Sequence, residues 1–270
     1  MREFFPPRDE TGPRLALFLN AGDPPLAELP GLIAMLDGCG VDCLELAVPF
    51  PSSATDGPVI RRSAQRALAN GVGLDDVLEC VRELHSGLRH LRIALFADWS
   101  HTVRPRTLTT FVQQVANSNA DGVLIHALPP RLRPEYIEVA GEIGLPIVTS
   151  CYHGSTATVM AQAATHATAY LYLVAHYGRT GTAPAAGYAD LAATIVRLRT
   201  IARAPIAVGF GVKSRADLAQ IHQLGADAAI VGTAGVARIE RAVAEHRDVI
   251  DDFYDFLREL GAHRVKIHDD

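Results

Sequence analysis

The sequence has 270 residues, of which 49% are hydrophobic and 6% aromatic, and its formal net charge is −5. This mild acidity, with no long basic run, argues against a nucleic-acid-binding surface. No stretch approaches the roughly 18 apolar residues of a membrane span. Because the N-terminal residues also lack an apolar segment of signal-peptide length, we expect a cytoplasmic protein.

Short apolar segments alternate with longer amphipathic ones along the chain. In chain order the expected elements are a strand at Leu15–Asn20, a helix at Leu26–Asp37, a strand at Cys43–Val48, two helices within Val59–Ser86 separated at Asn70-Gly71, a strand at Arg92–Ala97, a helix at Thr107–Ser118, strands at Gly122–His126, Pro146–Ser150, Ala169–Val174 and Ile206–Phe210, a helix at Ser214–Gln223, a strand at Ala228–Gly232 and a helix at Asp248–Leu260.

Eight strands that alternate with helices predict parallel α/β architecture, and eight such units close into a (βα)8 TIM barrel. An open, doubly wound sheet is the main alternative, but the first strand ends in Asn20-Ala21-Gly22-Asp23-Pro24, which is not a dinucleotide fingerprint. The length suits one barrel, so a single domain is expected over residues 1–270, with flexible ends at residues 1–12 and 262–270.

Glu45 stands inside an otherwise apolar strand, Cys-Leu-Glu-Leu-Ala-Val. Facing outward it would meet the covering helices at a high cost in free energy, so we expect it to face the inside of the barrel. Burial there would raise its pKa toward neutrality, as a general acid or base requires. The alternative is a structural Glu paired with Arg or Lys in the polar layer of the barrel.

Asp56 follows in the next loop, just before Gly57-Pro58. An Asp-Gly-Pro sequence is often only a turn that starts a helix. Asp56 becomes a candidate because it shares one strand and loop with Glu45, and barrel active sites form where the strands end.

Two glycine turns end the last two strands and predict a phosphate site. They are Gly209-Phe210-Gly211 and Gly232-Thr233. The loops after strands 7 and 8 are the usual phosphate site of this fold, where glycine lets backbone N–H groups approach the anion. Thr233 adds a hydroxyl donor.

Other polar residues near strand ends are less specific. The glycine-rich loop that contains Thr180 and Gly181 could be a mobile lid or a plain surface loop. Tyr170 and Tyr172 share one face of their strand, which could be pocket or core. His126, His153 and His176 lack the spacing of a metal site, so no metal is expected.

In order and spacing, these motifs resemble the tryptophan synthase α subunit family over nearly the whole chain. The most specific match is Leu44-Glu45-Leu46-Ala47-Val48-Pro49-Phe50 followed by Asp56-Gly57-Pro58. The resemblance implies retro-aldol cleavage of indole-3-glycerol phosphate to indole and glyceraldehyde 3-phosphate, without metal or organic cofactor.

The resemblance also implies roles for individual residues. Glu45 would protonate indole C3 and take the proton of the adjacent hydroxyl, and Asp56 would hold the indole N–H. Phe18 and Tyr172 would line the indole pocket. The remaining matches, to the phosphate-binding loops, are Thr180, Gly181, Gly211, Gly232 and Thr233, where threonine replaces the usual serine.

Several segments depart from the family pattern. Pro51-Ser52-Ser53 replaces a Ser-Asp-Pro segment that normally touches the β subunit, and Ala127-Leu128-Pro129 replaces an Asp-x-Pro turn. These changes favour a divergent lyase that acts on indole-3-glycerol phosphate, or a close analogue, without a β subunit. The alternatives are a conventional α subunit with its β partner, a barrel that runs a different reaction, and a non-catalytic barrel that binds a phosphorylated ligand or a protein.

Overall fold

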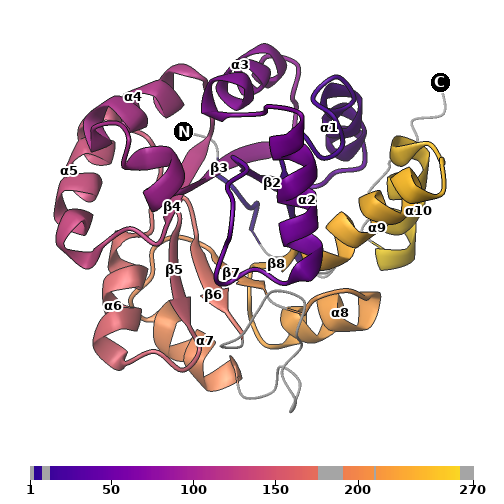
Figure 1. The fold of residues 1–270 in the computed structure, drawn as a ribbon. Helices are drawn as coiled ribbons and strands as arrows, with labels where there is room; N and C mark the ends of the chain where they lie inside the picture. Colours follow the sequence, from indigo (N-terminus) through magenta and orange to yellow (C-terminus); the bar gives the residue numbers. More distant parts are fainter. Residues whose placement is uncertain (1–2, 8–12, 176–190, 210, 262–270) are drawn as a thin grey trace.

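The computed structural model describes residues 3–7, 13–175, 191–209 and 211–261. Its eight parallel strands form one sheet in the order β4-β3-β2-β1-β8-β7-β6-β5, with the helices outside it (Figure 1). The predicted (βα)8 barrel is therefore confirmed. The strands are β1 (Arg14–Asn20), β2 (Cys43–Ala47), β3 (Arg92–Asp98), β4 (Gly122–His126), β5 (Thr149–Tyr152), β6 (Leu171–Val174), β7 (Ile206–Gly209) and β8 (Ala228–Val231).

Helices follow the strands and cover the outer face of the sheet. The α-helices are α1 (Leu29–Gly38), α2 (Pro58–Ala69), α3 (Leu74–His85), α4 (Leu108–Asn117), α5 (Arg133–Ile143), α6 (Ala157–His166), α7 (Leu191–Arg199), α8 (Arg215–Gln223), α9 (Thr233–Ala244) and α10 (Val249–Leu260). A π-helical turn, η1 (Trp99–Val103), follows β3, and a 3₁₀ turn, η2 (Pro130–Leu132), precedes α5. None of the helices in the described ranges is long and apolar enough to cross a membrane.

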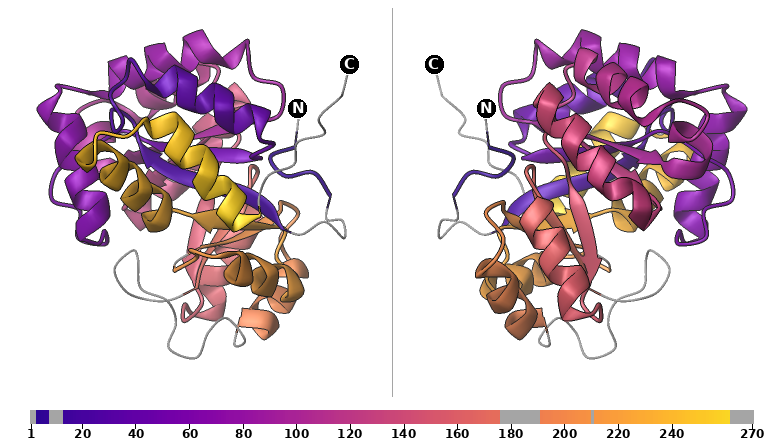
Figure 2. Two further views of the ribbon diagram at one scale, coloured as in Figure 1. Left: turned by 90° about the vertical axis from the view of Figure 1, so that its right-hand side faces the viewer. Right: turned by 90° about the vertical axis from the view of Figure 1, so that its left-hand side faces the viewer.

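Local signals in the sequence set several helix ends. The side chains of Ser214 and Asp248 cap α8 and α10 by accepting hydrogen bonds from backbone N–H groups of the first turn. Gly261 ends α10 with a φ of 68°, a conformation that glycine adopts without strain. The last helix packs against α1 and α9, so the end of the helical layer meets its beginning (Figure 2).

The two ends of the strand order meet at β4 and β5. In the described part of the chain this seam consists of a bridge between Val123 and Ile147. The Val123 N–H donates to the Pro146 carbonyl at 3.0 Å, and the Val148 N–H donates to the Val123 carbonyl at 2.9 Å. Within the described residues, the segment that leads into β5 pairs with β4 only around this bridge. The regular part of β5 therefore begins at Thr149, three residues later than the sequence suggested.

Large aromatic side chains fill the barrel interior on the side where the strands begin. Small inward-facing residues leave the space for them, namely Ala16, Cys43, Ala94, Ala207 and Ala228. Tyr170 occupies this space, with Phe4 and Phe5 against its ring at centroid distances of 5.5 and 5.2 Å. Both phenylalanines are buried, although they belong to the end that the sequence suggested to be flexible. The rest of that expectation lies mainly outside the described residues.

Candidate active site

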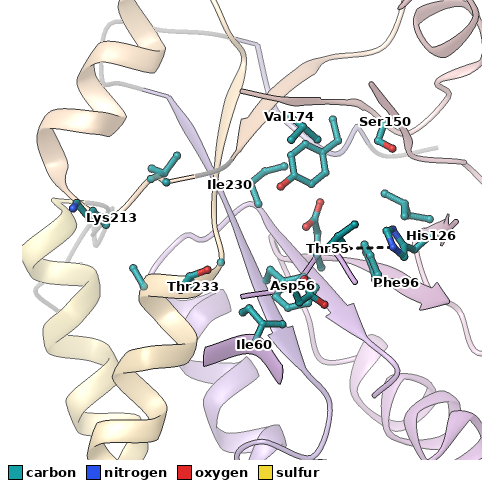
Figure 3. Close-up of a pocket in the computed structure, with 18 of the residues that line it drawn as sticks. Thr55, Asp56, Ile60, Phe96, His126, Ser150, Val174, Lys213, Ile230 and Thr233 are labelled. Carbon is teal, nitrogen blue, oxygen red and sulfur yellow. Dashed lines mark hydrogen bonds between the residues drawn. The ribbon is translucent and has the colours of Figure 1, made fainter. Parts of the chain in front are cut away.

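A cavity opens at the carboxyl ends of the strands, where the fold predicts the active site (Figure 3). Its empty volume is about 1130 Å³, including the part open to solvent. The residues that line it are Phe18, Glu45, Thr55, Asp56, Ile60, Phe96, Leu124, His126, Ser150, Tyr152, Tyr172, Val174, Gly211, Val212, Lys213, Ile230, Gly232, Thr233, Ala234 and Ala237.

Glu45 lies in the middle of β2, in register with Phe18 of β1 and Ala94 of β3. Its side chain faces the cavity and only 2% of its surface is exposed. The Tyr170 hydroxyl donates a hydrogen bond of 2.6 Å to Glu45 Oε1. Burial raises the pKa of Glu45 to about 7, against the opposing effect of the Tyr170 hydrogen bond. Near neutral pH this carboxyl can therefore both give and take a proton.

Asp56 lies in the loop between β2 and α2 and also lines the cavity. Pro58 starts α2 at a position that suits its fixed φ, so Asp56 sits just before the helix. The Asp56 N–H donates to Ser53 Oγ at 3.3 Å. Burial raises the pKa of the Asp56 carboxyl, whereas a hydrogen bond from Ser53 and the neighbouring His126 and Arg61 oppose that rise.

Both predicted phosphate loops line the cavity, and Lys213 and Thr233 lie on the opposite side of it from His126 (Figure 3). Gly211 has a φ of 78°, which favours glycine, and Gly232 immediately precedes Thr233, the first residue of α9. The free N–H groups of the first turn of α9 thus lie beside the cavity, an arrangement that binds anions. Lys213, two residues after Gly211, is exposed and borders the cavity.

Aromatic side chains form the wall next to the carboxylates. Phe18 meets Phe96 edge to face with ring centroids 5.6 Å apart. Tyr172 lines the cavity, whereas Tyr170 lies below it in the core, so the two tyrosines on one face have separate surroundings. A Cβ atom on Gly209 would lie 2.7 Å from the Tyr172 hydroxyl, so glycine there makes room for this ring.

The structure thus brings together Phe18, Glu45, Asp56, Tyr172, Gly211, Gly232 and Thr233 around one cavity. The other two candidates, Thr180 and Gly181, lie outside the described residues. The sequence did not single out Phe96, Ser150 or Tyr152, which also line the cavity. Their positions near the ends of β3 and β5 were the signal in the sequence that could have identified them as lining residues.

Of the three histidines near strand ends, two lie in the described residues, and they have different surroundings. His126 at the end of β4 lines the cavity, while His153 Nδ1 is 3.0 Å from Thr194 Oγ1 of α7. His176 lies outside the described residues. His126 therefore belongs to the pocket wall, a place that the sequence did not assign to it.

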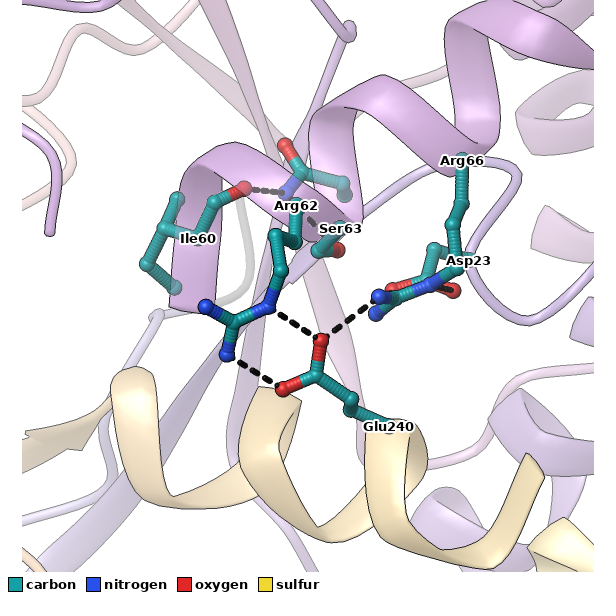
Figure 4. A network of polar contacts seen from close by, with 7 residues as sticks. Asp23, Ile60, Arg62, Ser63, Arg66 and Glu240 are labelled. Atoms are coloured by element: carbon teal, nitrogen blue, oxygen red, sulfur yellow. Dashed lines mark hydrogen bonds and ion pairs between the residues drawn. The ribbon is translucent and has the colours of Figure 1, made fainter. Parts of the chain in front are cut away.

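An ion-pair network joins the elements that carry the two halves of the site (Figure 4). Glu240 of α9 accepts hydrogen bonds from Arg62 at 2.7 and 2.8 Å and from Arg66 at 2.8 Å, both on α2. Arg66 also holds the buried carboxylate of Asp23, after β1, at 2.7 and 2.9 Å. Since Asp56 precedes α2 and Thr233 begins α9, this network fixes the separation of the carboxylate loop and the glycine turns.

Comparisons with known proteins agree with this geometry. Residues 6–264 match the sequence family described as "Tryptophan synthase alpha chain". The tryptophan synthase alpha chain of Acaryochloris marina is 36% identical over 234 residues, which cover 86% of each chain. That of Aromatoleum aromaticum is 32% identical over 252 residues, covering 93% of this chain and 91% of the relative.

Solved structures give the same result. The tryptophan synthase subunit alpha of Legionella pneumophila superposes with a TM-score of 0.80 at 29% identity, covering 93% of this chain and 92% of the other. A mutant alpha-subunit from Pyrococcus furiosus gives a TM-score of 0.81 at 26% identity, covering 92% of this chain and 98% of the other. The chain belongs to the tryptophan synthase alpha chain family.

Proposed function

We propose that this chain cleaves indole-3-glycerol phosphate, or a close analogue, to indole and glyceraldehyde 3-phosphate, and that it does so without a β subunit. This cleavage is the activity of the family to which the chain belongs. The observation that carries the proposal is the pair of largely buried carboxylates, Glu45 and Asp56, that face one cavity opposite an anion-binding helix start.

The reaction needs an acid that becomes a base. The protonated Glu45 gives its proton to indole C3 while Asp56 holds the ring N–H and stabilises the positive charge that develops there. The Glu45 carboxylate then takes the proton of the side-chain hydroxyl. The bond between C3 and the side chain breaks, its electrons return to the ring, and the hydroxyl carbon becomes the aldehyde. Protons balance, since Glu45 ends the cycle protonated.

The environments of the two carboxyls support these roles. A pKa of about 7 gives Glu45 a large protonated fraction at neutral pH. Burial raises the pKa of Asp56 as well, but a hydrogen bond from Ser53 and the nearby positive charge of Arg61 oppose that rise and favour its ionised form. Two carboxyls in different surroundings can take the acid and the electrostatic role at the same pH. The first turn of α9, with Thr233, and the turn at Gly211 are proposed to hold the phosphate.

Action without a partner is supported by how the loop after β2 is held within this chain. Phe50 of that loop stacks on His101 and His126, with centroid distances of 5.7 and 6.3 Å. Thr55 Oγ1 lies 3.4 Å from His126 Nε2. These contacts keep Asp56 at the cavity in the single chain, whereas members of the family usually pair with a β subunit.

The test is to incubate the purified chain alone with indole-3-glycerol phosphate and measure indole release. Wild type, Glu45→Gln and Asp56→Asn are compared with Glu138→Gln, which changes an exposed residue of α5. Fast release by wild type and Glu138→Gln, lost in the other two variants, supports the proposal. Release that appears only after a β subunit is added supports a conventional α subunit. No turnover in either condition overturns the proposed activity and favours a binding role.

A further inference from the structure

We propose that the ring bound by this pocket carries a neutral hydrogen-bonding substituent, a hydroxyl or an amino group, which is held by His126 with Thr55 and Ser150. This inference rests on the proposed function and specifies its substrate. It arises from a polar wall at the end of the cavity away from the phosphate loops.

His126 is fixed with its ring edge available for hydrogen bonds. Its ring is stacked on Phe96, with centroids 5.6 Å apart and planes 23° apart, and on Phe50, with centroids 6.3 Å apart and planes 29° apart. Stacking covers ring faces and leaves the nitrogen-bearing edge. In the described part of the chain, the hydrogen bond of this edge is a long one of 3.4 Å to Thr55 Oγ1. The imidazole is therefore held firmly while its hydrogen-bonding capacity is weakly used.

The polar wall faces the part of the ring that lies farthest from the phosphate. In Figure 3, Thr233 and Lys213 lie on one side of the cavity and His126 and Ser150 on the other, with Thr55 and Asp56 between them. A ring whose N–H is held by Asp56, and whose side chain runs toward Thr233, must turn its outer edge toward His126. Thr55 is next to Asp56 in the chain and brings its hydroxyl to the same edge.

The chemistry of this wall selects a neutral polar group. The imidazole and the hydroxyls of Thr55 and Ser150 can each donate and accept hydrogen bonds. Thr55 contacts His126 and Ser53 only at 3.4 and 3.5 Å. Against an unsubstituted ring, the remaining hydrogen-bonding capacity of the wall would face C–H groups and lose its contact with water, which costs free energy. An anionic substituent would be repelled by Asp56, which lies beside Thr55. Pockets that hydrogen-bond a substrate hydroxyl discriminate strongly against the analogue that lacks it.

The experiment measures ring preference in the direction of synthesis. Glyceraldehyde 3-phosphate is condensed with indole or with 4-, 5-, 6- or 7-hydroxyindole, and kcat/KM is obtained for each ring. In this direction ring C3 attacks the aldehyde carbon, whose oxygen takes the Glu45 proton, and the C3 proton then returns to Glu45. The readout is the ratio of the best hydroxyindole to indole, which cancels any general loss of active protein.

The decisive variant is His126→Phe, which keeps an aromatic ring between Phe50 and Phe96 and removes the hydrogen bonds. We expect wild type to prefer one hydroxyindole over indole by at least about tenfold, as one satisfied polar contact would give. In His126→Phe this ratio falls to about 1 or lower, and Ser150→Ala lowers it partly. His101→Phe is the matched control, since His101 ends the same stack outside the cavity, and its ratio stays that of wild type.

The outcomes separate this inference from the proposed function. Condensation of indole with no preference for any hydroxyindole, or a preference that His126→Phe leaves unchanged, overturns the polar-ring inference and leaves the lyase activity standing. Failure of every ring to condense, together with no cleavage of indole-3-glycerol phosphate, overturns both.

Discussion

The Tyr170 hydroxyl donates a 2.6 Å hydrogen bond to Glu45 Oε1 inside the barrel. This contact favours the ionised form of the carboxyl, while burial favours the protonated form, and burial dominates. Tyr170 therefore limits how far the pKa of Glu45 rises. Tyr170 lowers the pKa of the proposed acid, Glu45, from a position in the core beneath the cavity, which it does not line.

Tyr170→Phe removes this hydrogen bond and should raise the pKa of Glu45 further. Because the proposed reaction begins with protonated Glu45, kcat/KM of wild type should fall as the pH rises through about 7. In the variant that fall should move to higher pH. The measurement is a profile of kcat/KM for indole release against pH. Tyr136→Phe is the control, because Tyr136 is also buried but donates to the Val123 carbonyl at 3.1 Å. An unshifted alkaline limb in Tyr170→Phe would contradict this account.

Glu45→Gln should abolish activity and stabilise the fold at neutral pH. The native state binds the Glu45 proton more tightly than the unfolded chain, so stability falls as pH rises from about 4.5 to about 7 and then levels off. The ionised carboxyl costs about 3 kcal/mol above that range. Glutamine avoids this cost and can still accept the Tyr170 hydrogen bond.

Urea unfolding of wild type and Glu45→Gln at pH 8 and pH 5 measures this effect. The variant should be more stable by about 3 kcal/mol at pH 8 and by less than about 1 kcal/mol at pH 5. A difference that does not change with pH would show that the gain comes from packing and not from ionisation.

Arg66→Ala should destabilise the protein by about 3 kcal/mol, because it leaves the buried Asp23 carboxylate without its partner. Arg62→Ala removes an exposed arginine from the same Glu240 and should cost much less, because solvent screens an exposed ion pair. Thermal or urea unfolding compares the two variants. Addition of Asp23→Asn to Arg66→Ala should recover part of the loss. Equal effects of the two arginine variants would contradict the importance of the buried pair.

Gly209→Ala should displace the Tyr172 ring, since the new Cβ would lie 2.7 Å from its hydroxyl. Displacement of the Tyr172 ring from its place in the pocket wall should lower kcat/KM by tenfold or more, with little loss of stability. Gly141→Ala provides the control, because its Cβ would meet no atom within 4 Å on α5. It should leave activity unchanged and add about 0.5–1 kcal/mol of stability. Wild-type kinetics in Gly209→Ala would show that Tyr172 tolerates the shift.

The repeated alternation of strands and helices was enough to predict the barrel, because apolar runs and capping residues are local signals. Glu45 could be placed because a charged residue within an apolar strand has few acceptable positions. The seam at Val123 could not be predicted, since it depends on how the two ends of the sheet meet. His126 was named only as a histidine near a strand end, and its place in the pocket wall was not assigned for a related reason. Its role depends on Phe50 and Phe96, which are distant in the sequence and meet it only when the barrel closes.

Because Phe4 and Phe5 are buried, the pKa of the proposed acid, Glu45, depends on residues at both ends of the barrel. A Cβ atom on Gly122, the first residue of β4, would lie 2.9 Å from the Phe4 ring, so this ring lies at the amino ends of the strands, opposite the cavity. It shields Tyr170, and through Tyr170 it shields Glu45, from water on that side. Removal of Phe4 and Phe5 would let water reach the Glu45 carboxyl from the amino ends of the strands. The pKa of the proposed acid thus depends in part on Phe4 and Phe5, which do not line the cavity.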